Sequence, residues 1–512
     1  MSWEDAYPTF RQRPATIPDL LRWRAETNAD DVALVAPDGM LTFADWARRA
    51  TGIARLLDTR GIEPLTPVGI WGDNTRGADW ASALLGVQWA GAVPVPLNSR
   101  LPWPAVLTTL ERLDADVLVL QSNEPVDGVK AIRFDELPRD GELGEPVPAP
   151  EDPAAILHTS GTTGLPKPIV LSHVCLALIG AATEDHILGE YSGIEPLRAG
   201  DVLQTSVGLH TSSGLMHILL VGIYSGVRLV VEAGFGVEST IETMRREKTK
   251  LWFCVPSMMV LVGDASPGPV PEAMLAAAWH AGSPVSEAAL EGMRRAFPGS
   301  TALNLYSLTE SGAAIYSSSA EDALLRPGTV GLPIPTTEAR VLRDDDTPVA
   351  PGEPGRILLR SVHMLDGYWR NRRIEPGGLD DDGWMDTGDG GTVDSAGHTW
   401  VTGRMGDLII RGGYNVAPFV VEAALLEHAA VTDAAVVPVP HRVLGQDLVA
   451  VVVAREDVDS DSLREHCRSR LANYEIPRTV IRVDELPRNE FGKLDRRAIR
   501  ADAEERTQAL RA

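Results

Sequence analysis

The segment Thr159-Ser-Gly-Thr-Thr-Gly-Leu-Pro-Lys167 is the most informative part of this 512-residue chain. It contains two glycines and four hydroxyl side chains, whose N–H and O–H groups can donate to phosphate oxygens. Glycine allows the positive φ angles that turn successive N–H groups toward one anion. Lysine is rare here, five of 47 basic residues, and the stretch ends on one of the five. We therefore interpret this stretch as a phosphate-binding loop.

The residues on either side of this loop predict a hairpin. Ile156-Leu157 and Ile169–Leu171 are typical of short buried strands, so the loop is expected to connect them. The spacing of Gly161, Gly164 and Lys167 differs from that of a Walker A loop, G-x-x-x-x-G-K-S/T. From these residues alone, a plain surface turn rich in glycine and threonine is an alternative. The motifs further along the chain favour the phosphate loop.

Length, charge and cysteine content narrow the class of protein. A chain of 512 residues exceeds what one core usually holds, so two or more domains are expected. The net charge of −24 argues against a protein that binds nucleic acid or an anionic membrane. Three widely spaced cysteines suggest neither a disulfide framework nor a zinc site and fit a reducing, cytoplasmic setting. The most apolar run, Leu215–Val231, is short and interrupted, which favours a buried helix and strand over a membrane span.

Hydrophobic periodicity predicts an α/β fold. A helical pattern at Trp46–Arg60 precedes a β-rich run at Val68–Trp71, and this alternation implies βα units and largely parallel sheets. Residues 325–400 differ, with short β segments such as Glu338–Leu342 between turns rich in proline, glycine and aspartate. After Arg404, about one hundred residues are enough for a small α/β domain.

Four further motifs follow the loop in a fixed order. They are Asn304–Glu310 (NLYSLTE), Trp384–Asp389 (WMDTGD), Gly403–Asp407 (GRMGD) and Arg488–Lys493 (RNEFGK). Together with the loop they resemble the signatures of the adenylate-forming superfamily, which includes acyl- and aryl-CoA synthetases, the adenylation domains of peptide synthetases and beetle luciferases. The resemblance covers nearly the whole chain.

The resemblance implies a multi-domain α+β architecture. A large N-terminal domain, 1–404, would combine βα-layered sheets with a distorted β-barrel and bind ATP and the acyl substrate. Residues 405–406 would be the hinge, with Gly406 where aspartate or lysine is typical. A small mobile α/β domain, 407–512, would carry the catalytic lysine.

The resemblance also assigns an ATP site. It implies that the loop binds the β- and γ-phosphates and that Thr309 donates to the α-phosphate. It also implies that Glu310 holds Mg²⁺, because this hard cation prefers carboxylate oxygen. Tyr306 would stack on adenine, and Asp389 with Arg404 would bind the ribose hydroxyls. The ATP- and AMP-binding residues expected in this way are Thr159, Ser160, Gly161, Thr162, Thr163, Gly164, Lys167, Gly282, Ser283, Pro284, Asn304, Tyr306, Ser307, Asp389 and Arg404.

The same resemblance gives the catalytic group and the thiol path. Lys493 would contact both the substrate carboxylate and the α-phosphate and cancel the repulsion between two anions that must meet. Thr309, Glu310 and His210 complete the expected catalytic set. A tunnel for the thiol of CoA is expected along a short loop of the C-terminal domain, whose residues are Arg411, Gly412, Gly413 and Tyr414.

His210 stands where relatives place the acyl pocket. Adenylation domains of peptide synthetases usually carry aspartate there, so its absence argues against an α-amino acid substrate. A buried structural histidine is the alternative. Room for a bulky or branched acyl group is suggested by Gly208, Ser212, Ser213 and Gly214, but glycine equally serves close backbone packing. The expected pocket residues are Val207, Gly208, His210, Ser213, Gly214 and Ser307, the last replacing the usual glycine.

These observations predict an AMP-forming acid–thiol ligase. It would convert a carboxylic acid and ATP into acyl-AMP and pyrophosphate, and then transfer the acyl group to CoA, with Mg²⁺ as the metal. The alternative within the superfamily is a stand-alone adenylating enzyme that loads the phosphopantetheine thiol of a carrier protein. A luciferase-like oxygenase is disfavoured because nothing singles out oxygen chemistry, and a silent binding protein because no signature lysine or carboxylate is missing. The identity of the acid and the oligomeric state stay open.

Overall fold

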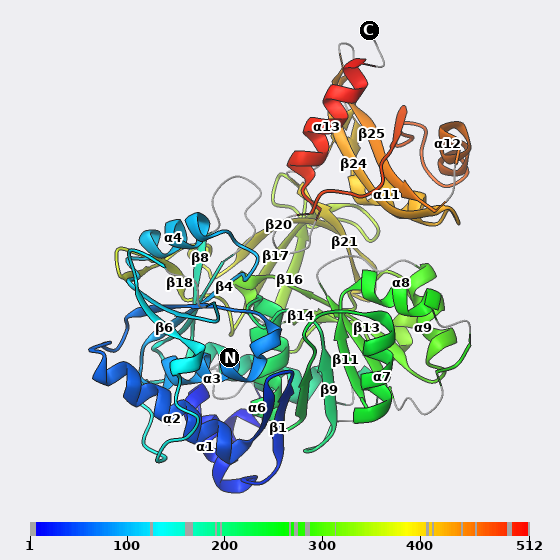
Figure 1. Cartoon of the computed structure of the whole chain (residues 1–512). Coiled ribbons are helices and arrows are strands. Elements are labelled where there is room, and N and C mark those ends of the chain that lie inside the picture. Colours follow the sequence, from blue (N-terminus) through cyan, green and yellow to red (C-terminus); the bar gives the residue numbers. More distant parts are fainter. Residues whose placement is uncertain are drawn as a thin grey trace. The chain divides into compact units, whose positions relative to one another are not determined.

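The computed structural model of the chain describes residues 7–122, 126–158, 167–189, 192–194, 197–265, 268–270, 275–281, 287–312, 314–405, 409–411, 414–441, 444–455, 458–488 and 494–509 (Figure 1). The chain forms two compact units. The first comprises Met1–Val285, Ala289–Ala339 and Leu359–Met385, and the second comprises Ser286–Ala288, Arg340–Leu358 and Asp386–Ala512. The predicted boundaries at 404 and 406 stay predictions.

A nine-stranded sheet is the largest element of the first unit. Its strand order is β15-β14-β13-β12-β11-β9-β10-β1-β2, with parallel pairing from β13 to β1 and antiparallel pairing at both edges. The strands are β1 (Val32–Ala36), β2 (Gly39–Thr42), β9 (Val202–Thr205), β10 (Arg228–Val231), β11 (Leu251–Cys254), β12 (Ala277–Ala281), β13 (Thr301–Ser307), β14 (Ala314–Ser317) and β15 (Leu332–Pro333). Three helices, α7 (Val237–Glu247), α8 (Pro256–Ala265) and α9 (Glu287–Ala296), pack with the sheet in one apolar cluster (Figure 1).

A second, fully parallel sheet has the order β4-β3-β5-β6. Its strands are β3 (Pro67–Trp71), β4 (Val93–Leu97), β5 (Val117–Leu120) and β6 (Lys130–Arg133). The helices of this part of the chain are α1 (Ile17–Thr27), α2 (Phe43–Thr59), α3 (Gly77–Trp89) and α4 (Trp103–Arg112). Every residue of α3 is buried, as expected of a helix that is apolar all round. A capping box of Thr42 and Asp45 starts α2 and satisfies its first backbone donors. The predicted helix at 46–60 and the predicted α/β class are confirmed.

The predicted hairpin around the phosphate loop is also confirmed. β7 (Pro153–His158) and β8 (Pro168–Ser172) pair antiparallel and belong to a third sheet of order β19-β18-β8-β7. The other two strands are β18 (Gly367–Arg370) and β19 (Arg373–Glu375). Helix α5 (His173–Ala182) follows β8 directly, where Ser172 caps it by accepting from the Cys175 N–H at 3.3 Å. The predicted helix and strand within 215–231 are α6 (Leu220–Ser225) and β10, and α10 (Ala320–Leu325) completes this unit's helices among the described residues.

The second unit holds two sheets. One has the order β16-β17-β20-β21, formed by β16 (Thr337–Leu342), β17 (Gly355–Ser361), β20 (Met385–Val393) and β21 (Thr399–Arg404), and the chain passes between the two units within β16, β17 and β20. The other has the order β23-β22-β25-β24, with β26 beside β25. Its elements are β22 (Ile409–Arg411), β23 (Tyr414–Val416), α11 (Pro418–Leu426), β24 (Val431–His441), β25 (Gly445–Ala454), α12 (Ser460–Arg468), β26 (Thr479–Arg482) and α13 (Arg496–Ala509).

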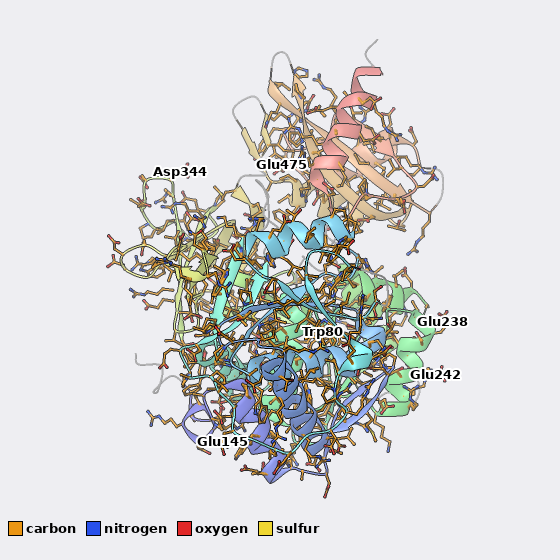
Figure 2. All side chains as sticks on the ribbon, turned by 60° about the vertical axis from the view of Figure 1, so that its left-hand side comes forward. Trp80, Glu145, Glu238, Glu242, Asp344 and Glu475 are labelled. Carbon is orange, nitrogen blue, oxygen red and sulfur yellow. The ribbon has the colours of Figure 1, made fainter. Side chains whose placement is uncertain are left out.

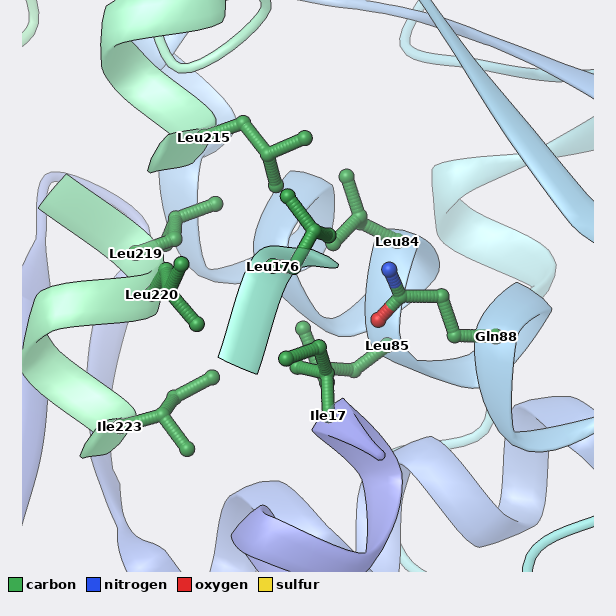
Figure 3. A pocket seen from close by; sticks show the side chains of 9 residues that line it. All are labelled: Ile17, Leu84, Leu85, Gln88, Leu176, Leu215, Leu219, Leu220 and Ile223. Atoms are coloured by element: carbon green, nitrogen blue, oxygen red, sulfur yellow. The ribbon is translucent and has the colours of Figure 1, made fainter. Parts of the chain in front are cut away.

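A small cavity lies among the helices of the first unit (Figure 3). Its walls are leucine and isoleucine side chains from α1, α3, α5 and the segment 214–225, with Gln88 as the one polar side chain among them. The Gln88 amide nitrogen donates to the Ala154 carbonyl at 2.8 Å. This apolar void lies within the helical core rather than at the strand ends that carry the motifs.

The charged and thiol side chains follow the expected distribution. Glu238 and Glu242 point outward from α7, whereas Trp80 lies inside the first unit (Figure 2). Cys175, Cys254 and Cys467 are buried free cysteines. Within the described part of the chain, no helix is long and apolar enough to cross a membrane.

Candidate active site

Two groups of predicted site residues follow the carboxyl ends of parallel strands of the nine-stranded sheet. The loop 206–213 follows β9, and the turn Thr309–Ser311 follows β13. Since β9, β11, β12 and β13 are neighbours that run parallel, their carboxyl ends meet at one edge of the sheet. Open α/β sheets bind their ligands at this edge. Two motifs almost one hundred residues apart in the chain therefore converge there.

The loop after β9 is held by Asn74, which the sequence reasoning missed. The Asn74 amide nitrogen donates to the Val207 carbonyl at 3.0 Å, and its amide oxygen accepts from the Leu209 N–H at 3.0 Å. Within the loop, the Thr211 hydroxyl donates to the Gly208 carbonyl at 2.8 Å and accepts from the Gly214 N–H at 2.9 Å. These bonds fix the backbone around His210. Asn74 lies in no motif, so no sequence pattern pointed to it.

The two glycines of this loop lie close to other atoms of the loop. A Cβ added to Gly208 would lie 2.6 Å from His210 Cε1, and a Cβ added to Gly214 would lie 2.3 Å from the Gly208 carbonyl oxygen. Both distances are too short for non-bonded atoms, so glycine allows close packing at both positions. The place of both glycines in the acyl pocket stays a prediction.

His210 is neutral at ordinary pH. Burial, followed by the positive charge of Arg100, lowers the pKa of the imidazole to about 4. Its Nδ1 atom is buried and makes no hydrogen bond with the described residues. A neutral imidazole offers one donor and one acceptor. His210 can thus orient a carboxylate by hydrogen bonding but adds no positive charge to the pocket.

The turn after β13 places Thr309 next to the loop after β9. The Thr309 hydroxyl donates to Ser212 Oγ at 3.4 Å, so the two motifs are in direct contact. Ser311 fixes the turn, because its hydroxyl accepts from the Leu308 N–H at 3.0 Å and donates to the Leu308 carbonyl at 2.9 Å. The expected donor to the α-phosphate therefore lies beside the expected acyl pocket.

Glu310 suits a magnesium ion. Its side chain is half-buried beside Thr309, and the described residues contain no cluster of three or more histidine, cysteine or acidic side chains that could cage a metal. Mg²⁺ is usually held by one or two carboxylates together with substrate phosphates rather than by an all-protein cage. A single partly exposed carboxylate at the strand edge fits this pattern.

The expected adenine residues of β13 are Asn304, in the middle of the strand, and Tyr306, near its carboxyl end. The Asn304 amide nitrogen donates to the Thr329 carbonyl at 3.0 Å, which holds this side chain at the sheet. The Tyr306 ring lies 5.9 Å from the Tyr316 ring, centroid to centroid, and is half-buried, as is Ser307. β13 thus presents Tyr306 and Ser307 immediately before the turn that carries Thr309.

Lys167 is the described residue of the phosphate loop. It immediately precedes β8, its side chain is exposed, and its ammonium lies 5.6 Å from the centroid of the Tyr368 ring. Tyr368 belongs to β18, which pairs with β8. No sequence motif singled out Tyr368.

In the second unit, Asp389 and Arg404 form a pair. They are register partners on β20 and β21, and Arg404 Nε lies 3.1 Å from the Asp389 carboxylate. Arg404 also donates to the Thr387 carbonyl at 2.5 Å. Asp389 is buried whereas Arg404 is exposed, so the two side chains supply a fixed acceptor and an accessible donor. A ribose with two hydroxyls needs this combination.

Arg411, one of the residues expected along the thiol tunnel, connects several segments of the second unit. Its Nε lies 2.8 Å from the buried Asp447 carboxylate, and its Nη1 donates to the carbonyls of Tyr474 and Ile476 at 2.9 and 3.0 Å. Arg478 lies 3.4 Å from the other oxygen of Asp447. Arg411 therefore holds the backbone at 474–476 against β22.

The segment that carries Lys493 lies outside the described residues, but both of its ends are described. Arg488 and Leu494 pair as an isolated antiparallel bridge. Arg496 makes a forked ion pair with Glu422, at 2.7 and 2.9 Å, and Glu422 also accepts from the Val436 N–H at 2.7 Å. The base of the segment is thus anchored to α11 and β24.

Several predicted site residues lie outside the described residues. These are Thr159, Ser160, Gly161, Thr162, Thr163, Gly164, Gly282, Ser283, Pro284, Gly406, Gly412, Gly413 and Lys493, and of Tyr414 only the backbone is described. Their roles stay predictions.

Comparison with known families accounts for most of the chain. The AMP-binding enzyme family matches residues 21–369, and the AMP-binding enzyme C-terminal domain matches residues 420–493. Among curated proteins, the sulfoacetate–CoA ligase of Cupriavidus necator is 30% identical over 94% of this chain and 96% of its own length.

Solved structures give the same result. The o-succinylbenzoate CoA synthetase of Bacillus subtilis in complex with its acyl-adenylate intermediate has a TM-score of 0.85 and 27% identity, with 94% of this chain and 98% of that chain covered. The same enzyme in complex with ATP and magnesium ion has a TM-score of 0.83 and 26% identity over 93% of this chain and 98% of that chain.

Proposed function

Because this chain belongs to the AMP-binding enzyme family, we propose that it activates a carboxylic acid with ATP to give acyl-AMP and pyrophosphate, and then transfers the acyl group to CoA. The observation that carries the proposal is the contact between Thr309 and Ser212, which joins the expected phosphate and acyl sides at one sheet edge. The curated relative that makes an acyl-CoA and the solved relative with a bound acyl-adenylate support the same two-step reaction.

The first step needs charge neutralisation at the α-phosphate. A carboxylate must approach a phosphate, and both are anions, so cationic and hydrogen-bonding groups have to face the developing charge. In this proposal Lys167 contacts the β- and γ-phosphates, Thr309 donates to the α-phosphate, and Glu310 holds Mg²⁺. Mg²⁺ held at Glu310 would supply positive charge that reduces the negative charge of the phosphates.

The acyl side of the proposed site carries polar side chains. His210 is neutral and can make hydrogen bonds. Ser212, two residues later in the same loop, accepts a hydrogen bond from the Thr309 hydroxyl. Nothing in this loop supplies the carboxylate that would hold an α-amino group, which supports an acid without that group. The CoA and carrier-protein alternatives share this first step.

The second step requires a different arrangement of the chain. We place the adenylating domain at 1–404, the hinge at 405–406 and the mobile domain at 407–512. Rotation of the mobile domain about the hinge would move Lys493 away from the acyl-AMP and bring the loop from Arg411 to Tyr414 to the thiol. The buried cysteines support a reducing, cytoplasmic setting for this chemistry.

One assay tests the proposal. AMP formation is measured with ATP, Mg²⁺ and a panel of carboxylic acids, first with acid alone and then with CoA or a phosphopantetheinylated carrier protein. Acid-dependent pyrophosphate exchange with CoA-dependent turnover is the expected result. Turnover with the carrier protein only would establish the alternative, and no acid-dependent exchange across the panel would overturn the function.

Replacing Glu310 by glutamine is expected to weaken activity mainly through Mg²⁺. The amide keeps the shape of the side chain but loses the charge that a hard cation prefers. The concentration of Mg²⁺ at half-maximal rate should rise about tenfold, the factor that ~1.4 kcal/mol of binding produces. Titration of Mg²⁺ at saturating ATP measures this shift. An unchanged rate and metal dependence would remove Glu310 from the metal site.

Replacing Gly406 by proline is expected to spare acyl-AMP formation and to slow thioester formation. Proline fixes φ near −65° and restrains the preceding residue, which blocks the dihedral change of a hinge. Thioester formation should slow by at least about tenfold, equivalent to ~1.4 kcal/mol of barrier. Pyrophosphate exchange and acyl-CoA production are measured side by side. If both persist at the wild-type rate, the hinge lies elsewhere, with Asp407 as the next candidate.

A further inference from the structure

Tyr368 occupies a position between two charged groups of the proposed ATP site. Its strand, β18, pairs antiparallel with β8, and Tyr368 is the register partner of Ile169. β8 begins one residue after Lys167, so the tyrosine lies beside the end of the phosphate loop. The Lys167 ammonium is 5.6 Å from the centroid of the tyrosine ring, within the range of a cation–π contact.

Glu310 also lies near Tyr368. The Leu365 N–H, three residues before Tyr368, donates to the Glu310 carbonyl at 2.8 Å. Burial and the negative charge of Glu310 raise the pKa of the phenol, so Tyr368 stays protonated at neutral pH. One tyrosine thus lies near both the cation of the phosphate loop and the proposed metal carboxylate.

Two glycines pack against the ring of Tyr368. A Cβ added to Gly377 would lie 3.0 Å from Tyr368 Cε2, and one added to Gly378 would lie 3.0 Å from its hydroxyl oxygen. Gly378 has a φ of +86°, a conformation that other residues rarely adopt. Two glycines therefore let the backbone pack closely against the Tyr368 ring.

We propose that Tyr368 is a positioning residue that holds the Lys167 ammonium at the phosphate end of the site. This proposal rests on the proposed function, since it assumes that Lys167 contacts the β- and γ-phosphates of ATP. An exposed lysine samples many rotamers, and an aromatic face under its ammonium reduces that sampling before ATP arrives. The tyrosine itself touches no reacting atom; it acts through the lysine.

Nucleotide binding without turnover provides the direct test. Calorimetry measures the affinity of a non-hydrolysable ATP analogue and of AMP for the wild type and for Tyr368→Leu, Tyr368→Phe and Lys167→Ala. Tyr368→Leu should weaken binding of the ATP analogue by about 2- to 30-fold, the range that a cation–π contact covers. AMP lacks the β- and γ-phosphates, so its affinity should not change. Phenylalanine keeps the ring face and should restore most of the loss.

A double-mutant cycle shows whether Tyr368 acts through Lys167. If it does, the combined variant should bind the ATP analogue no more weakly than Lys167→Ala alone. Lys130→Ala, which removes an exposed lysine paired with Asp116, is the matched control for loss of a cation. Additive losses, or an equal loss of affinity for AMP, would overturn the positioning role and leave Tyr368 as a packing residue.

The assay of the wild type separates this proposal from the function on which it rests. Acid-dependent pyrophosphate exchange by the wild type establishes the function whatever the tyrosine variants do. With exchange present, a Tyr368→Leu variant that keeps wild-type KM for ATP, while Lys167→Ala raises it, overturns the positioning proposal alone.

Discussion

Replacing Lys493 by alanine should lower the rate of acyl-AMP formation by about 10²–10³-fold, the loss typical when one group that stabilises developing charge is removed. The expected cause is electrostatic. The ammonium would contact both the substrate carboxylate and the α-phosphate, and without it two anions must approach each other in a water-poor site.

The same variant should still convert chemically prepared acyl-AMP and CoA into the thioester. The lysine is expected at the site in only one of the two arrangements of the chain. Pyrophosphate exchange and thioester formation from acyl-AMP, each measured on Lys493→Ala and on the exposed-lysine control Lys130→Ala, separate the two steps. Equal losses of rate in both half-reactions would contradict the prediction that Lys493 acts only in acyl-AMP formation.

Replacing Asp79 by asparagine should lower the free energy of unfolding of the first unit by about 3–5 kcal/mol, as expected when one partner of a buried ion pair loses its charge. The Asp79 side chain is fully buried on α3 and forms ion pairs with Arg49, Arg76 and Arg139. Arg49 is itself 4% exposed, so its charge would be left in the interior without compensation. Asparagine keeps the shape, which isolates the effect of the charge.

Asp140→Asn is the matched control for this stability prediction. Asp140 pairs with Arg48 at 3.1 Å, but its side chain is 77% exposed. Exposed pairs of this kind contribute about 0–1 kcal/mol because water and salt screen them. Denaturant unfolding of both variants measures the difference. Similar stabilities for Asp79→Asn and Asp140→Asn would show that the buried network contributes little.

Local patterns predicted the elements that depend on neighbouring residues. The helix at 46–60 and the hairpin of β7 and β8 follow from periodicity and from the run of apolar residues on each side of a glycine-rich loop. The order of the motifs predicted the family. Each of these signals lies within a short window of sequence.

The missed residues depend on contacts between distant segments. Asn74 fixes a loop more than one hundred residues later, and Tyr368 meets Lys167 only because β18 pairs with β8. Neither residue lies in a motif or in a periodic pattern. For Gly208 and Gly214, the sequence left room for the acyl group and close packing both open, and the close approach to His210 and to the loop backbone appeared only in the structure.

The division of the second unit among three chain segments has a consequence for synthesis of the protein. The segment Arg340–Leu358 leaves the ribosome before Leu359–Met385, which belongs to the first unit, and before Asp386–Ala512, which completes the second. β20 and β21 follow β17 in the sheet order. At a synthesis rate of ~5–20 residues per second, they leave the ribosome a few seconds after β17. During that interval its edge is an unpaired template for other chains. A chain truncated within 359–385 would lack β20 and β21, so the edge of β17 would stay unpaired. Fragments that end there are therefore expected to aggregate.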